Sequence, residues 1–477
     1  MLSAQSVSSL SVTIAPHIGV RTIGSKLCLI NQRRREIWLC AGISGRIWNS
    51  LSAGEAVPAI VESIANRFRV PADKVSRDTL QFVQQLWQRE LIEVAGWHRQ
   101  PEAAEAREAA HNQTGHLYEE ALKASVLFRV WLDLLIPCNL RCRHCYLDFS
   151  ETEVVPLAEV YSRMDQLAEH GCPEIVLTGG EIFLRRDLLD IVAYAQSKGF
   201  LFDLYTNGNF IDERKADALA RHLVSTVQIS VYGTTAAIHE SITRKPGTFN
   251  KSIRAARLLI ERGIPVRLQC HVQQDNFEDA FRFPEFARSL GAEHQFDTKL
   301  VPNRDGSKEL LRFGVSVGQQ AELYRAGLIK RETKFVCTAA ASKARINAHG
   351  DIYPCELMNT VTLGNLRKES LKEIWASQRR AALRRQILDY KPKRCGGCSH
   401  TSDCEPCAAM RGFEQPNHMD APISESCLLT AASLAAQGRA IPAGVQEFGD
   451  DCIAAIQHSD PARALTPLIQ IMSARVS

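Results

Sequence analysis

Between residues 127 and 300, short apolar runs alternate with segments in which apolar residues recur at helical spacing. The apolar runs predict strands at 127–136, 174–178, 201–206, 226–231, 266–272 and 295–300. After the first run, Leu157, Val160 and Met164 fall on one face of a helix. Repeated strand–helix units predict an α/β fold with a parallel sheet and right-handed crossovers.

The first 95 residues follow a different pattern. Three short runs at 18–23, 26–31 and 36–40 predict strands. Apolar residues then take helical spacing over 57–68 and 80–91, with Ser76 as the N-cap of the second helix. This order predicts a separate small α+β domain of winged-helix type at 1–95. Residues 96–124 are polar and rich in Ala and Glu, which predicts a partly helical linker.

Composition and charge narrow the class of protein. The 477 residues are 45% hydrophobic and 23% charged, as in soluble proteins of two to four domains. A net charge of +4 gives no electrostatic reason to expect nucleic acid. The N-terminus lacks the pattern of an export signal, and no apolar run reaches the ~18–20 residues that span a bilayer. We therefore predict a cytoplasmic location and no membrane partner.

Fifteen cysteines without an export signal indicate metal or redox chemistry and not disulfides. Ten of them fall into two groups, at 138–145 and 337–427, and the other five are predicted to be ordinary buried thiols.

Cys138, Cys142 and Cys145 directly follow the first predicted strand, with three and then two residues between them. Three thiolates on one loop can hold three irons of a cubic 4Fe-4S cluster and leave the fourth iron open. A zinc loop is the alternative, although zinc sites usually combine two CxxC-like pairs. The segment resembles the cluster loop of the radical S-adenosylmethionine (SAM) family, in which the amine and carboxylate of SAM occupy the open iron. The resemblance implies a partial (β/α)6 barrel with chemistry at the carboxyl ends of its strands.

Strand ends downstream strengthen this resemblance. Thr178-Gly179-Gly180-Glu181 closes the second predicted strand, and in the family this motif receives the SAM amino group, with Ile182 here in place of the usual proline. Glycines at a strand end let the backbone approach a ligand closely. The resemblance implies further cofactor contacts at His144, Tyr146, Asn207, Ser230 and Arg244. For Ser230, an ordinary hydrogen-bonded strand residue is the alternative.

The second cysteine group begins with Cys337, twelve residues, Gly350, four residues and Cys355. It resembles the SPASM domain, whose seven cysteines bind two auxiliary 4Fe-4S clusters. The resemblance implies one cluster on Cys395, Cys398, Cys404 and Cys427 and another on Cys337, Cys355 and Cys407, although two residues separate Cys404 from Cys407 where three are usual. Residues 338–343 contain no extra cysteine, so one iron would be open to a substrate thiolate or capped by another residue. A zinc knuckle at 395–407 is the alternative, which leaves three of the cysteines unexplained.

Fused to such an enzyme, the N-terminal domain resembles the peptide chaperone of pyrroloquinoline-quinone biosynthesis, which recognises leader peptides of ribosomal-peptide maturases. In that fold an extended leader adds a strand to an exposed sheet edge. A winged-helix DNA-binding domain is the alternative, and the Arg33-Arg34-Arg35 turn would suit it.

These resemblances imply a leader-recognition domain (1–95), a linker (96–124), a radical SAM partial barrel (125–305), a SPASM domain (306–430) and a helical tail (431–477). The implied cofactors are SAM and three 4Fe-4S clusters, one of which binds SAM. The implied partners are a ribosomal precursor peptide or small protein subunit, bound through its leader, and an electron donor such as flavodoxin or ferredoxin.

The expected reaction is installation of a crosslink by way of a 5′-deoxyadenosyl radical. A Cys-to-carbon thioether is our first choice because an open iron would bind the substrate thiolate. The related maturation proteins of quinohemoprotein amine dehydrogenase, which link Cys to Asp or Glu carbons, are one specific candidate that the resemblance implies. Carbon–carbon crosslinking, as in the pyrroloquinoline-quinone peptide cyclase, is the alternative. A non-catalytic, metal-stabilised peptide-binding scaffold is the alternative from another class. No residue identifies a catalytic acid or base.

Overall fold

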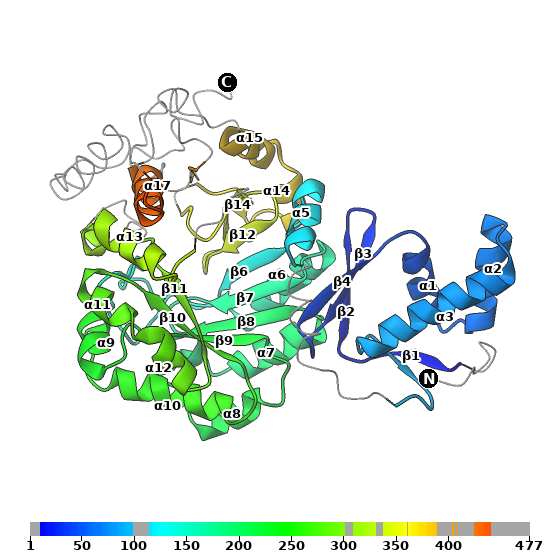
Figure 1. Ribbon diagram of the computed structural model, residues 1–477, viewed down its shortest axis with the longest axis horizontal. Coiled ribbons are helices and arrows are strands. Elements are labelled where there is room, and N and C mark those ends of the chain that lie inside the picture. Colours follow the sequence, from blue (N-terminus) through cyan, green and yellow to red (C-terminus); the bar gives the residue numbers. More distant parts are fainter. Residues whose placement is uncertain are drawn as a thin grey trace.

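The computed structural model describes residues 10–98, 114–300, 309–330, 337–359, 361–388, 403–404, 407 and 424–439. Its centre is a sheet of nine strands in the order β11-β10-β9-β8-β7-β6-β12-β13-β14 (Figure 1). Six consecutive parallel strands form most of it: β6 (Arg129–Asp133), β7 (Glu174–Thr178), β8 (Leu201–Thr206), β9 (Thr226–Ser230), β10 (Val266–His271) and β11 (Glu293–Asp297). The predicted α/β fold class is confirmed.

Four of the six predicted barrel strands have different ends in the structure, and β9 and β10 end only one residue early. β6 stops at Asp133 instead of residue 136, because the chain then forms an isolated bridge from Leu135 to Val154, in which the Ile136 N–H donates to the Glu153 carbonyl. β11 begins and ends two to three residues earlier than the apolar pattern predicts. Strand limits therefore follow backbone pairing and not the apolar run alone.

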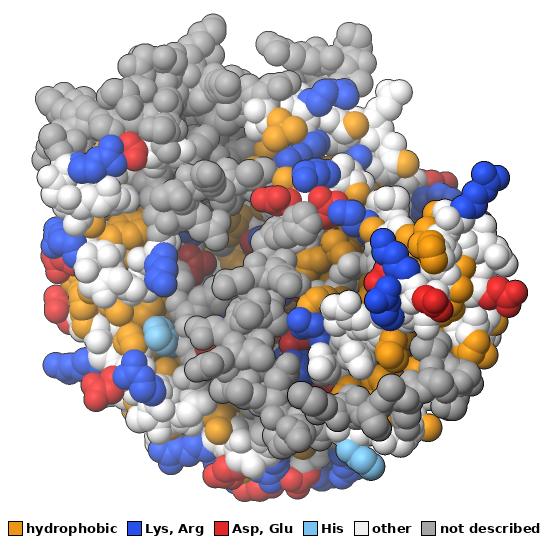
Figure 2. Space-filling view, turned by 45° about the vertical axis from the view of Figure 1, so that its right-hand side comes forward, with side chains coloured by type: hydrophobic (Ala, Val, Ile, Leu, Met, Phe, Trp, Pro, Cys, Tyr) orange, Lys and Arg blue, Asp and Glu red, His pale blue; other side chains and the backbone are white. Residues whose placement is uncertain are grey.

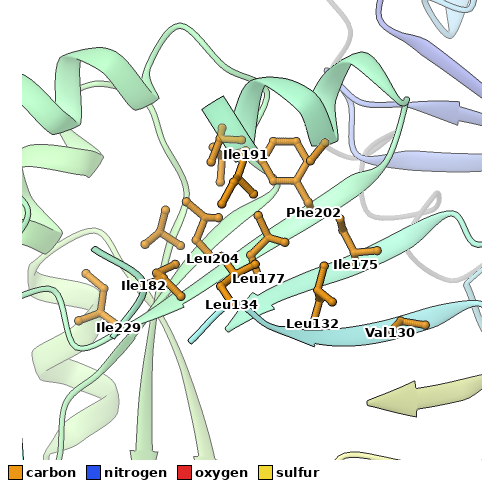
Figure 3. Close-up of a cluster of buried hydrophobic side chains, with 14 of the residues drawn as sticks. Val130, Leu132, Leu134, Ile175, Leu177, Ile182, Ile191, Phe202, Leu204 and Ile229 are labelled. Atoms are coloured by element: carbon orange, nitrogen blue, oxygen red, sulfur yellow. The ribbon is translucent and has the colours of Figure 1, made fainter. Parts of the chain in front are cut away.

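Helices cover one face of this sheet: α6 (Leu157–Glu169), α7 (Leu188–Ser197), α8 (Glu213–Leu219), α9 (Ala236–Thr243), α10 (Thr248–Ile260), α11 (Phe277–Ala280) and α12 (Phe283–Ser289). Figure 3 shows the apolar core beneath α7, where Leu132, Leu177, Leu204, Ile229 and Ile191 meet. Burial of these side chains is the main force that holds sheet and helices together. Because side chains alternate along a strand, their sequence neighbours lie on the opposite, concave face.

The sheet continues past residue 305 into the second cysteine region. β12 (Lys343–Ile346) pairs in parallel with β6, and β13 (Asp351–Tyr353) and β14 (Gly364–Asn365) extend it in antiparallel fashion. Helices α14 (Leu371–Ala376) and α15 (Gln378–Leu388) follow, and α13 (Val317–Arg325) packs on α17 (Ser424–Ala436). The auxiliary cysteine region is thus built onto the same sheet as the first cysteine loop.

The N-terminal residues form a three-stranded sheet of β2 (Ile18–Ile23), β3 (Lys26–Asn31) and β4 (Glu36–Cys40), as predicted. Helices α1 (Ile43–Ser52), α2 (Val57–Phe68) and α3 (Ala72–Gln88) follow, and β1 (Val12–Ile14) pairs with β5 (Ile92–Val94). The prediction of Ser76 as an N-cap is wrong. The helix begins at Ala72, directly after Pro71, because buried Val75 adds a turn to its apolar stripe.

This small sheet is buried on both faces. One face packs on α1–α3, and the other contacts Phe128 and Leu201 at the amino ends of the barrel strands. Helix α5 (Thr114–Ala124) lies in the predicted linker and adds buried Leu117 and Ala121 to the second contact. The N-terminal domain therefore packs directly against the barrel.

A buried arginine reinforces this contact. Arg21 donates to the carbonyls of Cys172 (3.0 Å) and Lys198 (2.5 Å), at the turns that follow α6 and α7. Its guanidinium also lies 4.9 Å from the Phe200 ring centre. A cation is stabilised at helix carboxyl ends because the last carbonyls are unpaired there.

The described helices include none that is long and apolar enough to cross a bilayer. Positive and negative side chains are interspersed on the face shown in Figure 2. The Arg33-Arg34-Arg35 turn is itself neutralised in part, because Arg34 lies 3.2 Å from the Glu36 carboxylate and Arg33 lies 3.8 Å from that of Glu90.

Candidate active site

The first cysteine loop leaves β6 at the carboxyl end of the sheet. Cys138, Cys142 and Cys145 are partly buried there. Burial, followed by the neighbouring Cys145 and Cys138, raises the pKa of Cys142 well above its ordinary value. Bound metal would reverse this effect, because a coordinated thiol is deprotonated. The three thiols are thus gathered at the strand ends, where the sequence predicts a cluster.

The donor set of the loop suits a cluster. Cys138, Cys142 and Cys145 supply three thiols on one short loop, and each cysteine of a cubane binds a different iron. The residues therefore fit a 4Fe-4S cluster with three protein ligands and one open iron.

Glu181 joins the ends of β7 and β8. Its fully buried carboxylate accepts hydrogen bonds from the Phe183 N–H (2.9 Å), the Thr206 hydroxyl (2.7 Å) and the Asn207 N–H (2.8 Å). Burial raises the pKa of Glu181 above its ordinary value, although these donors act in the opposite direction. Because both carboxylate oxygens of Glu181 already accept hydrogen bonds from the protein, this residue holds the ends of β7 and β8 together.

Asn207 connects the end of β8 to the cysteine loop. Its side-chain amide donates to the Asn139 Oδ1 (2.7 Å) and lies 3.9 Å from the Cys138 Sγ. The Leu140 N–H lies 3.5 Å from the same sulfur. Such N–H groups favour a thiolate over a thiol. The third strand end thus contacts the residue predicted to hold an iron.

The two glycines of the motif have a steric role that the sequence does not show. A Cβ on Gly179 would lie 2.3 Å from the Leu135 carbonyl oxygen, and one on Gly180 would lie 2.2 Å from the carbonyl oxygens of Ile136 and Pro137. Gly179 also has φ 138°, which side-chain-bearing residues rarely adopt. The sequence analysis assigned them to close approach of a ligand, and the structure adds close approach of the cysteine loop itself.

His144 lies in a polar and aromatic pocket beside the loop. Its Nδ1 is 2.9 Å from the Gln273 Nε2, which can only donate, so this nitrogen accepts. Its ring centre is 4.9 Å from that of Tyr232. Burial, followed by His271, lowers the pKa of His144 to about 3, so the imidazole is neutral at physiological pH. A neutral ring is suited to packing on a cofactor.

Tyr232 is a site residue that the sequence analysis did not single out. It follows β9, and burial, followed by Cys142, raises its pKa well above the ordinary value. Its backbone N–H donates to the His239 Nδ1 (3.1 Å). Tyr232 thus lies between the cysteine loop and α9. The sequence signal that could have identified Tyr232 is its position directly after the fourth predicted strand.

Two other predicted cofactor contacts lie at the margins of this pocket. The Arg345 guanidinium lies over Tyr146, 5.1 Å from the centre of the tyrosine ring. Arg244 is exposed and ends α9 in a left-handed conformation, with φ 55°. The next residue, Lys245, contacts the loop directly, because its Nζ donates to the Asn139 carbonyl (3.0 Å). The structure brings His144, Glu181, Asn207 and Ser230 around the loop and leaves Arg244 outside.

The concave face of the sheet beneath the loop is polar. Arg129 bridges Glu174 (3.0 Å) and Asp203 (2.5 Å), and Asp133 pairs with buried Arg345 (2.6 Å). Within the described residues, the buried Oε1 atoms of Gln228 and Gln269 have no hydrogen-bond partner. Unpartnered buried polar atoms destabilise a fold by about 1–3 kcal/mol each, so ligands or ordered water normally satisfy them. This face offers hydrogen-bonding groups to a molecule held below the loop.

Part of the auxiliary cysteine set is also brought together. Cys355 and Cys407 influence each other electrostatically, and burial, followed by Glu356 and Cys407, raises the pKa of Cys355 well above its ordinary value. The N–H groups of Leu357 and Met358 donate to the Cys355 sulfur, which suits a metal-bound thiolate. Arg384 donates to the Cys337 carbonyl (2.6 Å). Cys404 and Cys427 are partly buried, and Cys395 and Cys398 lie outside the described residues.

Three family matches agree with this geometry. The radical SAM superfamily matches residues 137–279, the SPASM iron–sulfur cluster-binding domain matches 337–399, and the coenzyme PQQ synthesis protein D (PqqD) matches 27–92.

Individual relatives are more distant. The AdoMet-dependent heme synthase of Methanosarcina barkeri is 23% identical, over 58% of this chain and 90% of its own. The PqqA peptide cyclase of Granulibacter bethesdensis is 26% identical, over 55% of this chain and 76% of its own. The crystal structure of Streptococcus suis SuiB bound to precursor peptide SuiA has a TM-score of 0.58 at 14% identity, over 83% of this chain and 96% of that chain.

The cysteine loop, the strand ends and these matches define a radical SAM enzyme. More narrowly, the chain combines the radical SAM domain with a SPASM and a PqqD domain, an architecture of peptide-modifying enzymes. Its cofactors are SAM and iron–sulfur clusters, as predicted. The predicted fold, a partial barrel between a small α+β domain and a cysteine-rich domain, is confirmed.

Proposed function

We propose that the enzyme installs a crosslink in a ribosomal precursor peptide or small protein subunit, and that this crosslink is a Cys-to-carbon thioether. The bound cluster and SAM would supply a 5′-deoxyadenosyl radical that abstracts hydrogen from an unactivated carbon. Cys138, Cys142 and Cys145 would hold the cluster. Glu181 and Asn207 would orient the loop, and the concave face would hold the substrate segment and exclude water.

The main support for a peptide substrate is the placement of the N-terminal domain. Its three-stranded sheet has two edges, β2 and β4. The β2 edge lies against the barrel, because a Cβ on Gly171 would be 2.7 Å from the Thr22 carbonyl and one on Gly19 would be 2.2 Å from the Gly199 carbonyl. Strand β4 pairs only with β3 within the described residues. An extended leader would therefore add to β4, where a peptide strand gains main-chain hydrogen bonds.

The thioether choice rests on the region after Cys337. Ala339, Ala340 and Ala341 are buried where an additional cysteine ligand would be expected, and none of them can ligate iron. An auxiliary cluster on Cys337, Cys355 and Cys407 would keep one iron for a substrate thiolate. Carbon–carbon crosslinking is the second candidate, supported by the similarity to a PqqA peptide cyclase. Three clusters and the five domain limits given above belong to this proposal.

The first test is anaerobic reconstitution with iron and sulfide, followed by iron quantitation and a SAM-cleavage assay. We expect about twelve irons in the wild type and about eight, without 5′-deoxyadenosine, after Cys138/Cys142/Cys145→Ala. The matched control is Cys172/Cys270→Ala, which removes buried thiols outside the predicted ligand sets and should keep iron and cleavage. Four irons plus bound zinc would rule out the auxiliary clusters. Absence of iron and of cleavage would favour the non-catalytic scaffold.

The leader site has its own test. Hydrogen exchange on the full enzyme should show slower exchange in β4 when a precursor peptide binds, with β2 unchanged. Slower exchange in β2 alone, or in neither strand at peptide concentrations that support crosslinking, would contradict strand addition at β4.

A further inference from the structure

The outer surface of the cysteine loop carries a group of cations. Arg141 donates to the carbonyls of Cys138 (2.8 Å) and Leu140 (2.9 Å), and Lys245 donates to that of Asn139 (3.0 Å). Arg141 and Lys245 are exposed, and so is Arg244, the residue before Lys245. Two exposed cations therefore hold the carbonyls of three consecutive residues that begin at the first predicted iron ligand.

An exposed aromatic ring adjoins these cations. The Arg141 guanidinium lies 4.4 Å from the ring centre of Phe149, which is 36% exposed. Exposed aromatic and arginine side chains are enriched where proteins bind each other. We call Arg141, Phe149, Arg244 and Lys245 the loop patch.

The loop patch keeps its positive charge. Within the part of the chain that the structure describes, no carboxylate pairs with Arg141, Arg244 or Lys245. The neighbouring cation, Arg143, is different, because it pairs with Asp275 (2.7 Å). Asp148 is close in sequence, but its carboxylate accepts from the N–H (2.8 Å) and hydroxyl (2.6 Å) of Ser150.

We propose that the loop patch is the docking site for an acidic one-electron carrier protein of the flavodoxin class. This inference rests on the proposed function, because a SAM-cleaving cluster must be reduced before each turnover. The carrier is oxidised by one electron and the cluster is reduced by one, with no proton or bond involved. Docking here places the carrier against the backbone of Cys138. An acidic carrier fits because opposite charges accelerate encounter and orient the two proteins.

The test compares two reductants in the reconstituted full-length enzyme. Dithionite reaches a cluster without a protein interface, whereas a purified bacterial flavodoxin, kept reduced by NADPH and flavodoxin reductase, must dock. The variant is Arg141→Glu/Lys245→Glu, and the readout is the ratio of flavodoxin-driven to dithionite-driven 5′-deoxyadenosine formation. This ratio cancels any difference in cluster content between samples.

We expect the ratio to fall about tenfold at low ionic strength and the difference to shrink as salt is added, because exposed charges are screened. Arg141→Lys/Lys245→Arg should restore it, and Phe149→Ser should lower it without changing the salt dependence. The matched control is Arg221→Glu/Arg288→Glu, which reverses two exposed charges after α8 and near the end of α12, at the opposite end of the barrel.

Three outcomes would overturn the docking site: an unchanged ratio, an equal fall in the control, or a wild type that dithionite drives and flavodoxin does not. Failure of dithionite to drive the wild type would instead contradict the proposed function, and the docking site with it. The dithionite arm thus separates the two failures.

Discussion

The two faces of the central sheet differ in chemistry although the same strands build both. On the helix-covered face, Leu132, Leu177, Leu204 and Ile229 are fully buried and need only to fill space (Figure 3). On the concave face, their neighbours form ion pairs and offer unpartnered amide oxygens. The first face supplies stability by burial, and the second holds polar groups at a cost in stability. This division is expected where a protein must bind a polar ligand inside its own core.

The largest predicted effect is on the concave face. Asp133→Ala should destabilise the protein by about 3–5 kcal/mol, because it leaves the buried guanidinium of Arg345 without its partner. Denaturant unfolding measures the change. Asp133→Leu/Arg345→Met should recover most of the loss. A single variant as stable as the wild type would show that the pair is not needed to hold β6 against β12.

A truncation on the helix-covered face should be similar in size but different in kind. Leu177→Ala removes a fully buried side chain and should destabilise the fold by about 2–5 kcal/mol. Because the Leu177 side chain lies on the helix-covered face and not on the concave face, SAM cleavage per cluster should stay within about twofold at temperatures where the variant is folded. A large loss of cleavage in the folded variant would contradict the separation of the two faces.

Acid should destabilise the site through His239. This residue is fully buried, and burial lowers its pKa to about 4 from an ordinary value of 6.5. Between these values the unfolded chain binds a proton that the folded chain does not, so stability is full above pH 6.5 and falls toward pH 4. The loss at pH 5 is about 2 kcal/mol. Because burial also lowers the pKa of His144, His239→Gln should reduce, without abolishing, the fall in melting temperature from pH 7.5 to pH 5, and a variant with the wild-type slope would contradict this source.

The smallest predicted effect has the opposite sign. Gln228→Leu removes a buried amide oxygen without a partner and should leave stability unchanged or raise it by about 1 kcal/mol. If the concave face binds substrate, the same variant should slow crosslinking while SAM cleavage without substrate persists. A stable variant with normal crosslinking would show that Gln228 faces only water.

Strand positions could be predicted well from the chain because each apolar run marks a buried strand. The three N-terminal strands and two barrel strands have the predicted limits. Prediction failed at Ser76 and after Asp133, where a proline and a backbone bridge decide the limits. Helix α1 and strand β1 were not predicted, since their apolar patterns are short.

The sequence by itself determined the class of chemistry, because cysteine spacing and a Gly-Gly-Glu strand end are local patterns. Only the tertiary structure decided what these residues touch. It shows that Glu181 bonds the next strand end, that Gly180 makes room for the cysteine loop, and that Tyr232 and Gln273 complete the pocket. It also places the β2 edge against the barrel, whereas β4 pairs only with β3 among the described strands. Contacts of this kind join residues far apart in the chain, so no local pattern records them.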